Sequence, residues 1–189
     1  MTLPADISPF LAPLAALQRL IDRVGGRGVI IGGIASSLLG KPRLTNSVAA
    51  MILFPAEEAL ALIQSAHLVG ILPRIPDADQ FAKRHRVVLL YHEASGISID
   101  ITLGMLPFEE EMVERSKLYS MGDFDIHLPS PEDLIILKAV AHRPNDILDI
   151  QAIIESQPDL DCKRIEEWVK QFAKALDMPD LWDDISKYL

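Results

Sequence analysis

The stretch "GGIASSLLGKPRLTNSVAAMILFP", residues 32–55, carries the features that decide the predicted fold. Two glycines follow the apolar run "GVII" and lead into a short helical segment and then a hydrophobic one. Backbone amides at a strand-to-helix turn point toward the helix N-terminus, where they can bind phosphate oxygens. Gly32 and Gly33 permit a close approach that a Cβ would block. Glycine pairs are also common at such turns for steric reasons, so the dipeptide alone favours a structural role.

Segments on both sides of this stretch alternate between helical and extended patterns. Apolar residues spaced three to four apart predict helices, and short β-branched runs between glycine or proline predict strands. In chain order we expect a helix at 8–23, a strand at 28–33, a short helix at 34–40, a strand at 48–54, a helix at 55–68, two strands at 85–93 and 96–104, a helix at 106–118 and a strand at 123–130. This order of elements places the chain in the α+β class.

The pattern is helical from Ser130 to the C-terminus. Ser130 is a predicted N-cap, and Pro131 follows it in the first turn, where proline is favoured. Prolines at positions 144, 158 and 179 divide this part into about four helices. We therefore predict an α+β domain over residues 1–127 and an all-helical C-terminal region over residues 128–189.

Composition and charge exclude several classes of protein. Of the 189 residues, 49% are hydrophobic and 24% are charged, which is typical of a globular protein and not of a disordered one. The formal net charge of −9 argues against strong binding of nucleic acid, which usually needs a basic face. Cys162 is the single cysteine, so an internal disulfide or a zinc cluster of cysteines is excluded. Without a secretory pattern or a run long enough to cross a bilayer, we expect a cytoplasmic protein with no membrane contact.

Beyond the glycine pair, the stretch resembles the nucleotidyltransferase fold shared by DNA polymerase β, the minimal nucleotidyltransferases and the nucleotidyltransferase toxins of bacterial abortive-infection systems. In the branch that it resembles most, Gly-Gly-x-Ala precedes a short helix, then Gly-x-x-Arg-x-Thr, and then Asp-x-Asp on the next strand. "GGIA" and "GKPRLT" match the first two motifs. The second motif places Arg43 and Thr45 just before the strand. Lys41 and Arg43 are equally well explained as phosphate-binding residues or as ordinary loop residues.

Two downstream segments extend the resemblance to about residues 28–157. The strand "SIDITLG" resembles the strand of the family's third carboxylate, which falls on Asp100. The segment "LIILKAVAHRPNDILDI" resembles the family's charged helical segment and contains Lys138. The resemblance implies a nucleotidyltransferase-like mixed sheet flanked by helices, with Asp100 and Lys138 as catalytic residues and Asp100 as a metal ligand. The implied nucleotide-binding residues are Gly32, Gly33, Lys41, Arg43, Thr45, Ser47, Arg143, Asp146 and Asp149.

The Asp-x-Asp motif is where this sequence departs from the family, because its two positions are Ser47 and Ala49. Residues two apart on a strand share a face and lie about 6–7 Å apart. Two such carboxylates and a third from a neighbouring strand can hold two Mg²⁺ ions about 3.5–4 Å apart. Serine is a weak neutral ligand and alanine is none, so Asp100 alone is expected to lose most Mg²⁺ affinity. The sequence leaves open whether the two carboxylates were lost in nature or removed by engineering.

Two interpretations remain open for the charged residues of the downstream segments. Asp100 lies between two isoleucines, so it is either a solvent-facing strand residue or a metal ligand. Lys138 and Arg143 either neutralise a triphosphate or form exposed ion pairs worth a few tenths of a kcal/mol each. In the first case Asp146 and Asp149, which are three residues apart and share a helix face, would orient the two cations.

Together the motifs predict a nucleotidyltransferase fold with a degenerate metal site. The family reaction transfers a nucleoside monophosphate from an NTP to a hydroxyl acceptor with Mg²⁺, and we expect this chain to catalyse it weakly or not at all. The alternative is a non-catalytic regulatory module that binds a nucleotide or a protein partner. Family members often act with a neighbouring partner protein, so the resemblance also implies a toxin–antitoxin pair as a setting for that alternative.

Overall fold

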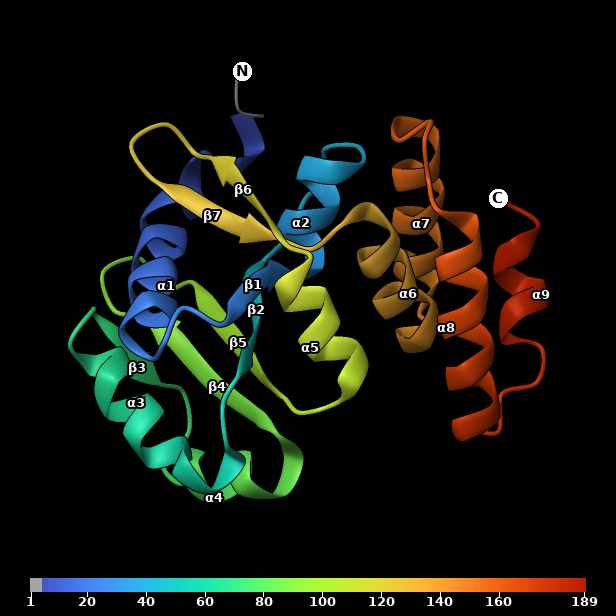
Figure 1. Ribbon diagram of the computed structural model, residues 1–189. Coiled ribbons are helices and arrows are strands. Elements are labelled where there is room, and N and C mark those ends of the chain that lie inside the picture. The colour runs from blue at the N-terminus through green and yellow to red at the C-terminus, as the bar shows by residue number, and fades with distance from the viewer. Residues whose placement is uncertain (1–4) are drawn as a thin grey trace.

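The computed structural model describes residues 5–189, which form a mixed sheet with helices on both faces and a bundle of helices beside it (Figure 1). The central sheet consists of β1 (Gly28–Ile31), β2 (Ser47–Leu53), β3 (Ile71–Pro73), β4 (Val87–His92) and β5 (Ser98–Gly104). Their spatial order is β1-β2-β5-β4-β3. Strands β2 and β5 run parallel, and the other neighbouring pairs run antiparallel. Strands β6 (Lys117–Ser120) and β7 (Asp125–Leu128) form a separate antiparallel pair.

Helices precede, connect and follow these strands. The α-helices are α1 (Leu11–Arg23), α2 (Gly32–Leu39), α3 (Ala59–His67), α4 (Ala78–His85), α5 (Pro107–Glu114), α6 (Pro131–Ala141), α7 (Pro144–Ser156), α8 (Cys162–Ala175) and α9 (Leu181–Ser186), and the short 3₁₀ turns η1 (Ala5–Phe10) and η2 (Ala56–Glu58) precede α1 and α3. Ser130 caps α6 as predicted, because its hydroxyl accepts the backbone N–H of Asp133 at 3.2 Å. Within the described residues, no helix is both long enough and apolar enough to cross a membrane.

The mixed sheet flanked by helices confirms the predicted fold class, although some elements differ from the prediction. The helix expected over 106–118 ends at Glu114, because the chain then turns into β6 and pairs with β7. Strand β3 and helix α4 were not predicted from the sequence. Strand β3 has three residues and ends at Pro73, so it is too short to show an alternating pattern. Tertiary pairing therefore decides these short elements.

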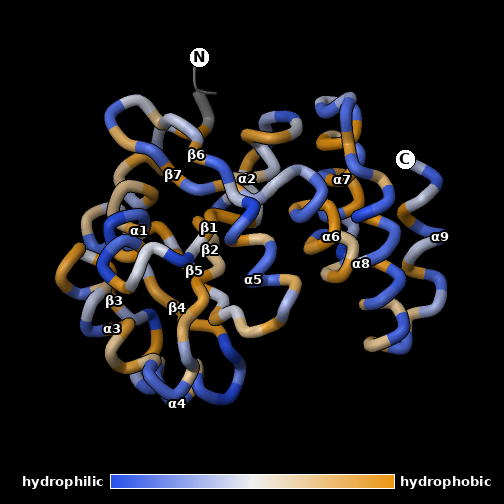
Figure 2. Tube along the Cα trace, in the orientation of Figure 1, coloured by the Kyte–Doolittle hydropathy of each residue, from blue (hydrophilic) through white to orange (hydrophobic). Residues whose placement is uncertain are grey.

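The two faces of the central sheet differ in their cover. Ile52, Leu90 and Ile101 belong to one face and are fully buried. Helix α1 covers this face, since a Cβ on Gly28 would contact both Ile52 and the Ile21 side chain of α1. The strands are correspondingly hydrophobic along most of their length (Figure 2). Alternate strand residues point to the opposite face, which is only half-buried and is therefore open to a ligand.

A buried ion cluster joins helix α8 to the rest of the molecule. Asp133 on α6 is fully buried, and its carboxylate accepts hydrogen bonds from Arg164 Nε at 2.8 Å and Arg115 Nε at 3.4 Å. Arg164 also donates from Nη1 to Glu111 on α5 at 2.8 Å. Phe108 of α5 packs edge-on against two aromatic rings of α8. These contacts link the two predicted parts of the chain, and their division after residue 127 stays a prediction.

Replacing Arg164 by alanine is predicted to lower the free energy of unfolding by about 2 kcal/mol, because the buried Asp133 carboxylate would keep only its longer contact with Arg115. Urea unfolding at neutral pH measures this change. Lys163→Ala is the matched control, since the Lys163 side chain is 84% exposed, and its effect is expected to stay within about 0.5 kcal/mol. An Arg164→Ala loss no larger than that of the control would contradict the assignment.

Candidate functional site

The chain enters the candidate site through a tight turn between β1 and α2. Gly32 has a φ of +68°, a left-handed conformation that favours glycine. A Cβ on Gly33 would lie 2.6 Å from Thr45 Oγ1 and 2.9 Å from Thr45 Cβ. Thr45 therefore packs directly against Gly33, so both glycines have a structural reason to be there. The same close packing places the Thr45 hydroxyl beside the first turn of α2.

Strands β2 and β5 bring the three positions of the metal motif together. They pair in parallel, with Ala49 opposite Asp100 and Ser47 opposite Ser98. Because alternate residues of a strand share a face, Ser47, Ala49 and Asp100 all belong to the half-open face of the sheet. The arrangement agrees with the geometry that the resemblance implies, although only Asp100 is a carboxylate.

Asp100 is paired with a residue that the sequence analysis did not identify. Arg74 follows the edge strand β3, and its Nη2 donates to Asp100 Oδ1 at 2.7 Å, across the intervening strand β4. Both side chains remain a little over one third exposed, at 36% for Arg74 and 38% for Asp100. The sequence carries no local signal for this pair, because the two residues are 26 positions apart and Arg74 follows β3, a strand that is not a neighbour of β5.

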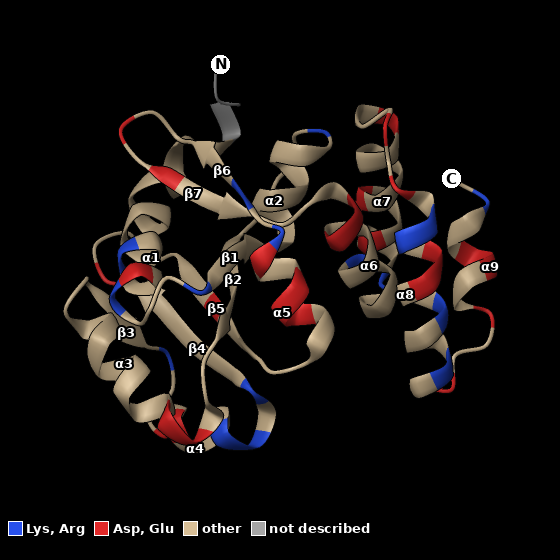
Figure 3. Ribbon diagram, viewed as in Figure 1, with Lys and Arg blue, Asp and Glu red and all other residues tan. Residues whose placement is uncertain are grey.

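Helices α6 and α7 hold a buried charge cluster beside the turn (Figure 3). Lys138 Nζ lies 2.9 Å from Asp146 Oδ1 and 2.5 Å from Asp149 Oδ2, and all three side chains are almost fully buried. Arg143 Nε donates to Asp146 Oδ2 at 2.6 Å. Arg43 donates from Nε and Nη2 to the two oxygens of Asp149 at 2.5 and 2.8 Å. The cluster therefore combines three cations with two anions.

The two carboxylates of this cluster remain ionised at neutral pH. Burial by itself raises the pKa of Asp146 and of Asp149, but hydrogen bonds from the neighbouring cations outweigh it and hold each pKa below the ordinary value. The cluster thus carries one net positive charge. The Arg143 side chain is 73% exposed and that of Arg43 is 35% exposed, whereas that of Lys138 is only 5% exposed. The two guanidinium groups, and not the Lys138 ammonium, face solvent.

One cavity of about 630 Å³ collects most of the predicted residues. Its lining residues are Gly32, Gly33, Arg43, Thr45, Ser47, Ala49, Asp100, Lys138, Arg143, Pro144, Asn145 and Asp146. Lys41 lies outside this lining and pairs instead with Glu155 at an exposed position. Asp149 is also outside the lining and contacts the cavity indirectly, through Arg43 and Lys138. We refer to this cavity as the main cavity.

A smaller cavity of about 280 Å³ opens beside the main cavity. The two share Gly32, Lys138, Arg143 and Asp146 as lining residues. The apolar lining residues of the smaller cavity are Ile31, Met51, Leu134, Leu137 and Ala141. Together the two cavities suit a ligand that has an anionic part and an apolar part.

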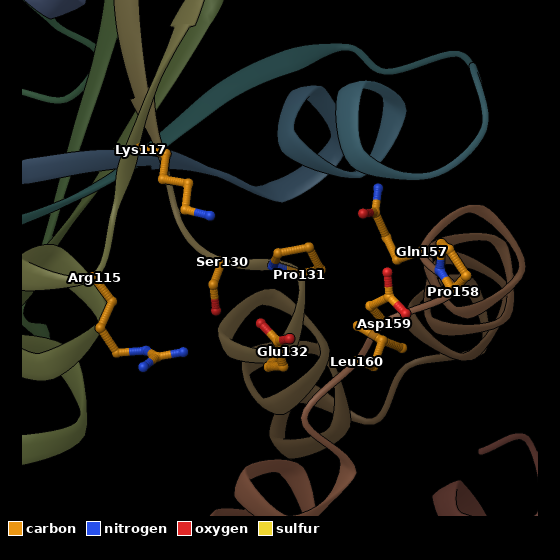
Figure 4. Close-up of a pocket in the computed structure, with 9 residues that line it drawn as sticks. All are labelled: Arg115, Lys117, Ser130, Pro131, Glu132, Gln157, Pro158, Asp159 and Leu160. Carbon is orange, nitrogen blue, oxygen red and sulfur yellow. The ribbon is translucent and has the colours of Figure 1, made fainter.

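A separate cavity of about 450 Å³ lies at the start of α6 (Figure 4). Arg115 and Lys117 line it together with Glu132 and Asp159. The Glu132 carboxylate already accepts the backbone N–H of Asp161 at 3.1 Å, and its pKa is lowered by such backbone hydrogen bonds although burial alone raises it. This cavity has two cations and two anions in its lining, whereas the main cavity has three cations and two anions, and the two cavities share no lining residue. The main cavity is therefore the better candidate for an anionic ligand.

This chain is similar to a protein family and to solved structures with the same fold. A family model described as a nucleotidyl transferase of unknown function (DUF2204) matches residues 85–178. An antigenic nucleotidyltransferase-like protein from Paracoccidioides brasiliensis has a similar structure, with a TM-score of 0.56 and 15% identity over 97% of this chain and 94% of that one. The chain has the nucleotidyltransferase fold. The antibiotic-resistance factor ANT(2'')-Ia also has a similar structure, with a TM-score of 0.53 and 13% identity over 89% of this chain and 95% of that one.

The nucleotidyltransferase resemblance inferred from the motifs is thereby confirmed. At such low identities the structural likeness shows the fold and carries no information about activity. The sequence matches no curated protein at a significant level.

The side chains of this nucleotidyltransferase-fold protein do not fit the pair of Mg²⁺ ions that the family generally uses. Among residues 5–189, no group of three or more His, Cys, Asp or Glu side chains is placed to hold a metal ion. On the strand face of the main cavity Asp100 stands without a second carboxylate, and it is already bonded to Arg74. Asp146 also lines the main cavity, but its oxygens accept hydrogen bonds from Lys138 and Arg143. No step through a metal ion follows from this arrangement.

Replacing Gly33 by alanine is predicted to lower the free energy of unfolding by about 1–3 kcal/mol, because the added Cβ overlaps Thr45. Thr45→Gly removes both overlapped atoms. In a protein that already carries Thr45→Gly, adding Gly33→Ala is therefore expected to lower the free energy of unfolding much less than it does in the unmodified protein. Urea unfolding of the four proteins of this cycle measures the coupling. Strictly additive effects at the two positions would show that the contact does not constrain the turn.

The stability of the protein is predicted to rise with pH in the acid range, up to about pH 5, because the folded-state pKa values of Asp146 and Asp149 lie below their unfolded values. The stability that these carboxylates contribute is present above the unfolded pKa of about 4 and is lost as the pH falls through the lowered folded pKa. Lys138→Met removes a cation from both carboxylates, raises their folded pKa values and flattens the rise. Urea unfolding at several pH values measures the slope of the free energy of unfolding against pH.

Lys163→Met changes the charge of the chain equally at an exposed position and is expected to keep the slope of the unmodified protein. A Lys138→Met protein with that same slope would show that Lys138 does not lower the two pKa values.

Proposed function

We propose that the protein binds a nucleotide through its phosphates in the main cavity and does not catalyse metal-dependent nucleotidyl transfer at a significant rate. The reaction that its resemblance implies is transfer of a nucleoside monophosphate from an NTP to a hydroxyl acceptor. The observation that carries the proposal is the pairing of Ala49 with Asp100 on adjacent parallel strands. Where the family motif would bring carboxylates together, this chain has a methyl group beside a carboxylate that is bonded to a guanidinium group.

The groups that remain in the main cavity support binding of phosphate. The first backbone amides of α2 have no partners within that helix, so they are available to an anion at the glycine turn. The guanidinium groups of Arg43, which is half-exposed, and of Arg143, which is exposed, already bond Asp149 and Asp146, and their remaining N–H donors suit phosphate oxygens. The buried cluster behind them leaves one net positive charge. These features favour an anionic ligand.

The cavity beside the main cavity supports a nucleotide over a simple polyphosphate. Five apolar side chains line it together with Thr102 and Glu109, and it shares a wall with the phosphate-binding groups through Gly32 and Arg143. A nucleobase is flat and largely apolar on its faces, so it suits a pocket lined by side chains such as Met51 and Leu134. The base would then lie next to the phosphates, in a pocket that also includes the carboxylate of Glu109.

Calorimetric titration with ATP, GTP, CTP and UTP tests the proposal. The unmodified protein is expected to bind at least one of them weakly in EDTA, with no increase in affinity when Mg²⁺ is added and no transfer of a labelled nucleotide. The variant Ser47→Asp with Ala49→Asp is expected to gain Mg²⁺-dependent affinity and measurable transfer, because it restores two carboxylates on the face that holds Asp100.

Ser47→Asn with Ala49→Asn is the matched control, since it adds side chains of similar size without charge and is expected to gain neither property. An unmodified protein that transfers nucleotide as fast as the aspartate variant would contradict the proposed inactivity. Binding of none of the four nucleotides would contradict the nucleotide-binding role. In that case a stable complex with a partner protein, found by co-purification, would favour the alternative regulatory module, including one half of a toxin–antitoxin pair.

A further inference from the structure

We propose that Arg74, which lies just outside the lining of the main cavity and is bonded to its lining residue Asp100, supplies a cation at the place where the nucleotidyltransferase family uses metal ions, and that it binds the phosphates of the nucleotide directly. The inference rests on the proposed function and adds a residue at the strand-side edge of the same cavity, next to Asp100. It follows from the disagreement between the family's metal chemistry and the side chains that this chain presents around Asp100.

The backbone and the carboxylate partner of Arg74 hold its guanidinium group in place. The backbone N–H of Arg74 donates to the Leu89 carbonyl at 2.9 Å, which ties the start of this loop to β4. Its Nη2 donates to Asp100 Oδ1 at 2.7 Å, and Asp100 lines the main cavity. The guanidinium group is therefore within hydrogen-bond distance of the carboxylate that the family would use for a metal ion.

Most of the donors of this guanidinium group remain available. A guanidinium group has five N–H donors, and within residues 5–189 the structure shows one side-chain hydrogen bond for Arg74, to Asp100. The side chain is 36% exposed, so a ligand can reach the remaining donors. A planar fork of this kind can bind a phosphate group with two parallel hydrogen bonds. Asp100 would then act as a positioning residue that orients Arg74.

The charges determine which form of the nucleotide is preferred. Arg74 and Asp100 cancel each other, and the cluster of Arg43, Lys138, Arg143 and the two buried aspartates adds one positive charge. Because residues 5–189 place no cluster of carboxylates to receive a metal ion, the cavity favours the more negative, metal-free triphosphate. Mg²⁺ neutralises part of the charge on a triphosphate, so it is expected to weaken binding. A site that uses metal shows the opposite response.

Titration of the full chain in EDTA with ATP, GTP, CTP, UTP and inorganic tripolyphosphate tests the role of Arg74. Arg74→Ala is expected to weaken binding by roughly tenfold or more, the usual effect of losing a charge-assisted hydrogen bond. Arg74→Lys keeps the positive charge but lacks the planar pair of donors, so its affinity is expected to lie between those of the unmodified protein and Arg74→Ala. Arg23→Ala is the control, since Arg23 is exposed in the last turn of α1, which covers the other face of the sheet.

The same substitution in the Ser47→Asp, Ala49→Asp protein gives a test with the opposite sign. There Arg74 competes with Mg²⁺ for the carboxylates, so Arg74→Ala is expected to strengthen Mg²⁺-dependent nucleotide binding. Weaker binding in that protein as well would overturn the idea that Arg74 stands in for metal.

The outcomes separate this inference from the proposed function. If the unmodified protein binds a nucleotide and Arg74→Ala binds it equally well, the role of Arg74 is wrong and the proposed function stands. If the unmodified protein binds none of the probes, both are wrong. Binding of tripolyphosphate as tightly as of every nucleotide, with the expected loss in Arg74→Ala, supports the role of Arg74 and contradicts recognition of a base.

Discussion

The ammonium group of Lys138 is enclosed between the carboxylates of Asp146 and Asp149, and the shape of the main cavity depends on this contact. Charges buried this deeply are stable only when they are paired, so the contact holds α6 and α7 in one fixed arrangement. Arg43 extends the cluster to the loop after α2, because it binds both oxygens of Asp149. That loop carries Thr45, which packs on Gly33. Sheet, turn and helices are thus connected through paired charges.

The strand side of the cavity has a different constraint, set by the parallel pairing of β2 and β5. The register puts Ala49 beside Asp100, so this position offers no metal ligand although the fold is kept. Arg74 pairs with the carboxylate that is left. A guanidinium group can attract phosphate, but unlike a metal ion it does not activate a hydroxyl as a nucleophile. The proposed function follows from this difference, since the cavity would still hold the phosphates of a ligand without a metal ion to activate a nucleophile.

Local patterns predicted the fold class well, because the long amphipathic helices and the buried strands carry strong periodicity. They missed β3 and β6, which are short and depend on pairing with neighbouring strands. The spacing of the motifs around Gly33 and Asp100 brought together most of the residues that line the main cavity. It left open whether Lys138 is exposed, and burial shows that Lys138 is neither a surface residue nor free of partners. The contact of Arg74 with Asp100 depends on strand order, which no local pattern records.

A crystal structure of the unmodified protein with a non-hydrolysable NTP and Mn²⁺, whose anomalous scattering reveals the metal, tests the central claim most directly. The account predicts phosphate oxygens within hydrogen-bond distance of the guanidinium groups of Arg43 and Arg74, and no anomalous peak next to Asp100. A manganese peak at coordination distance from Asp100, about 2 Å, with Arg74 displaced from that carboxylate, would contradict it.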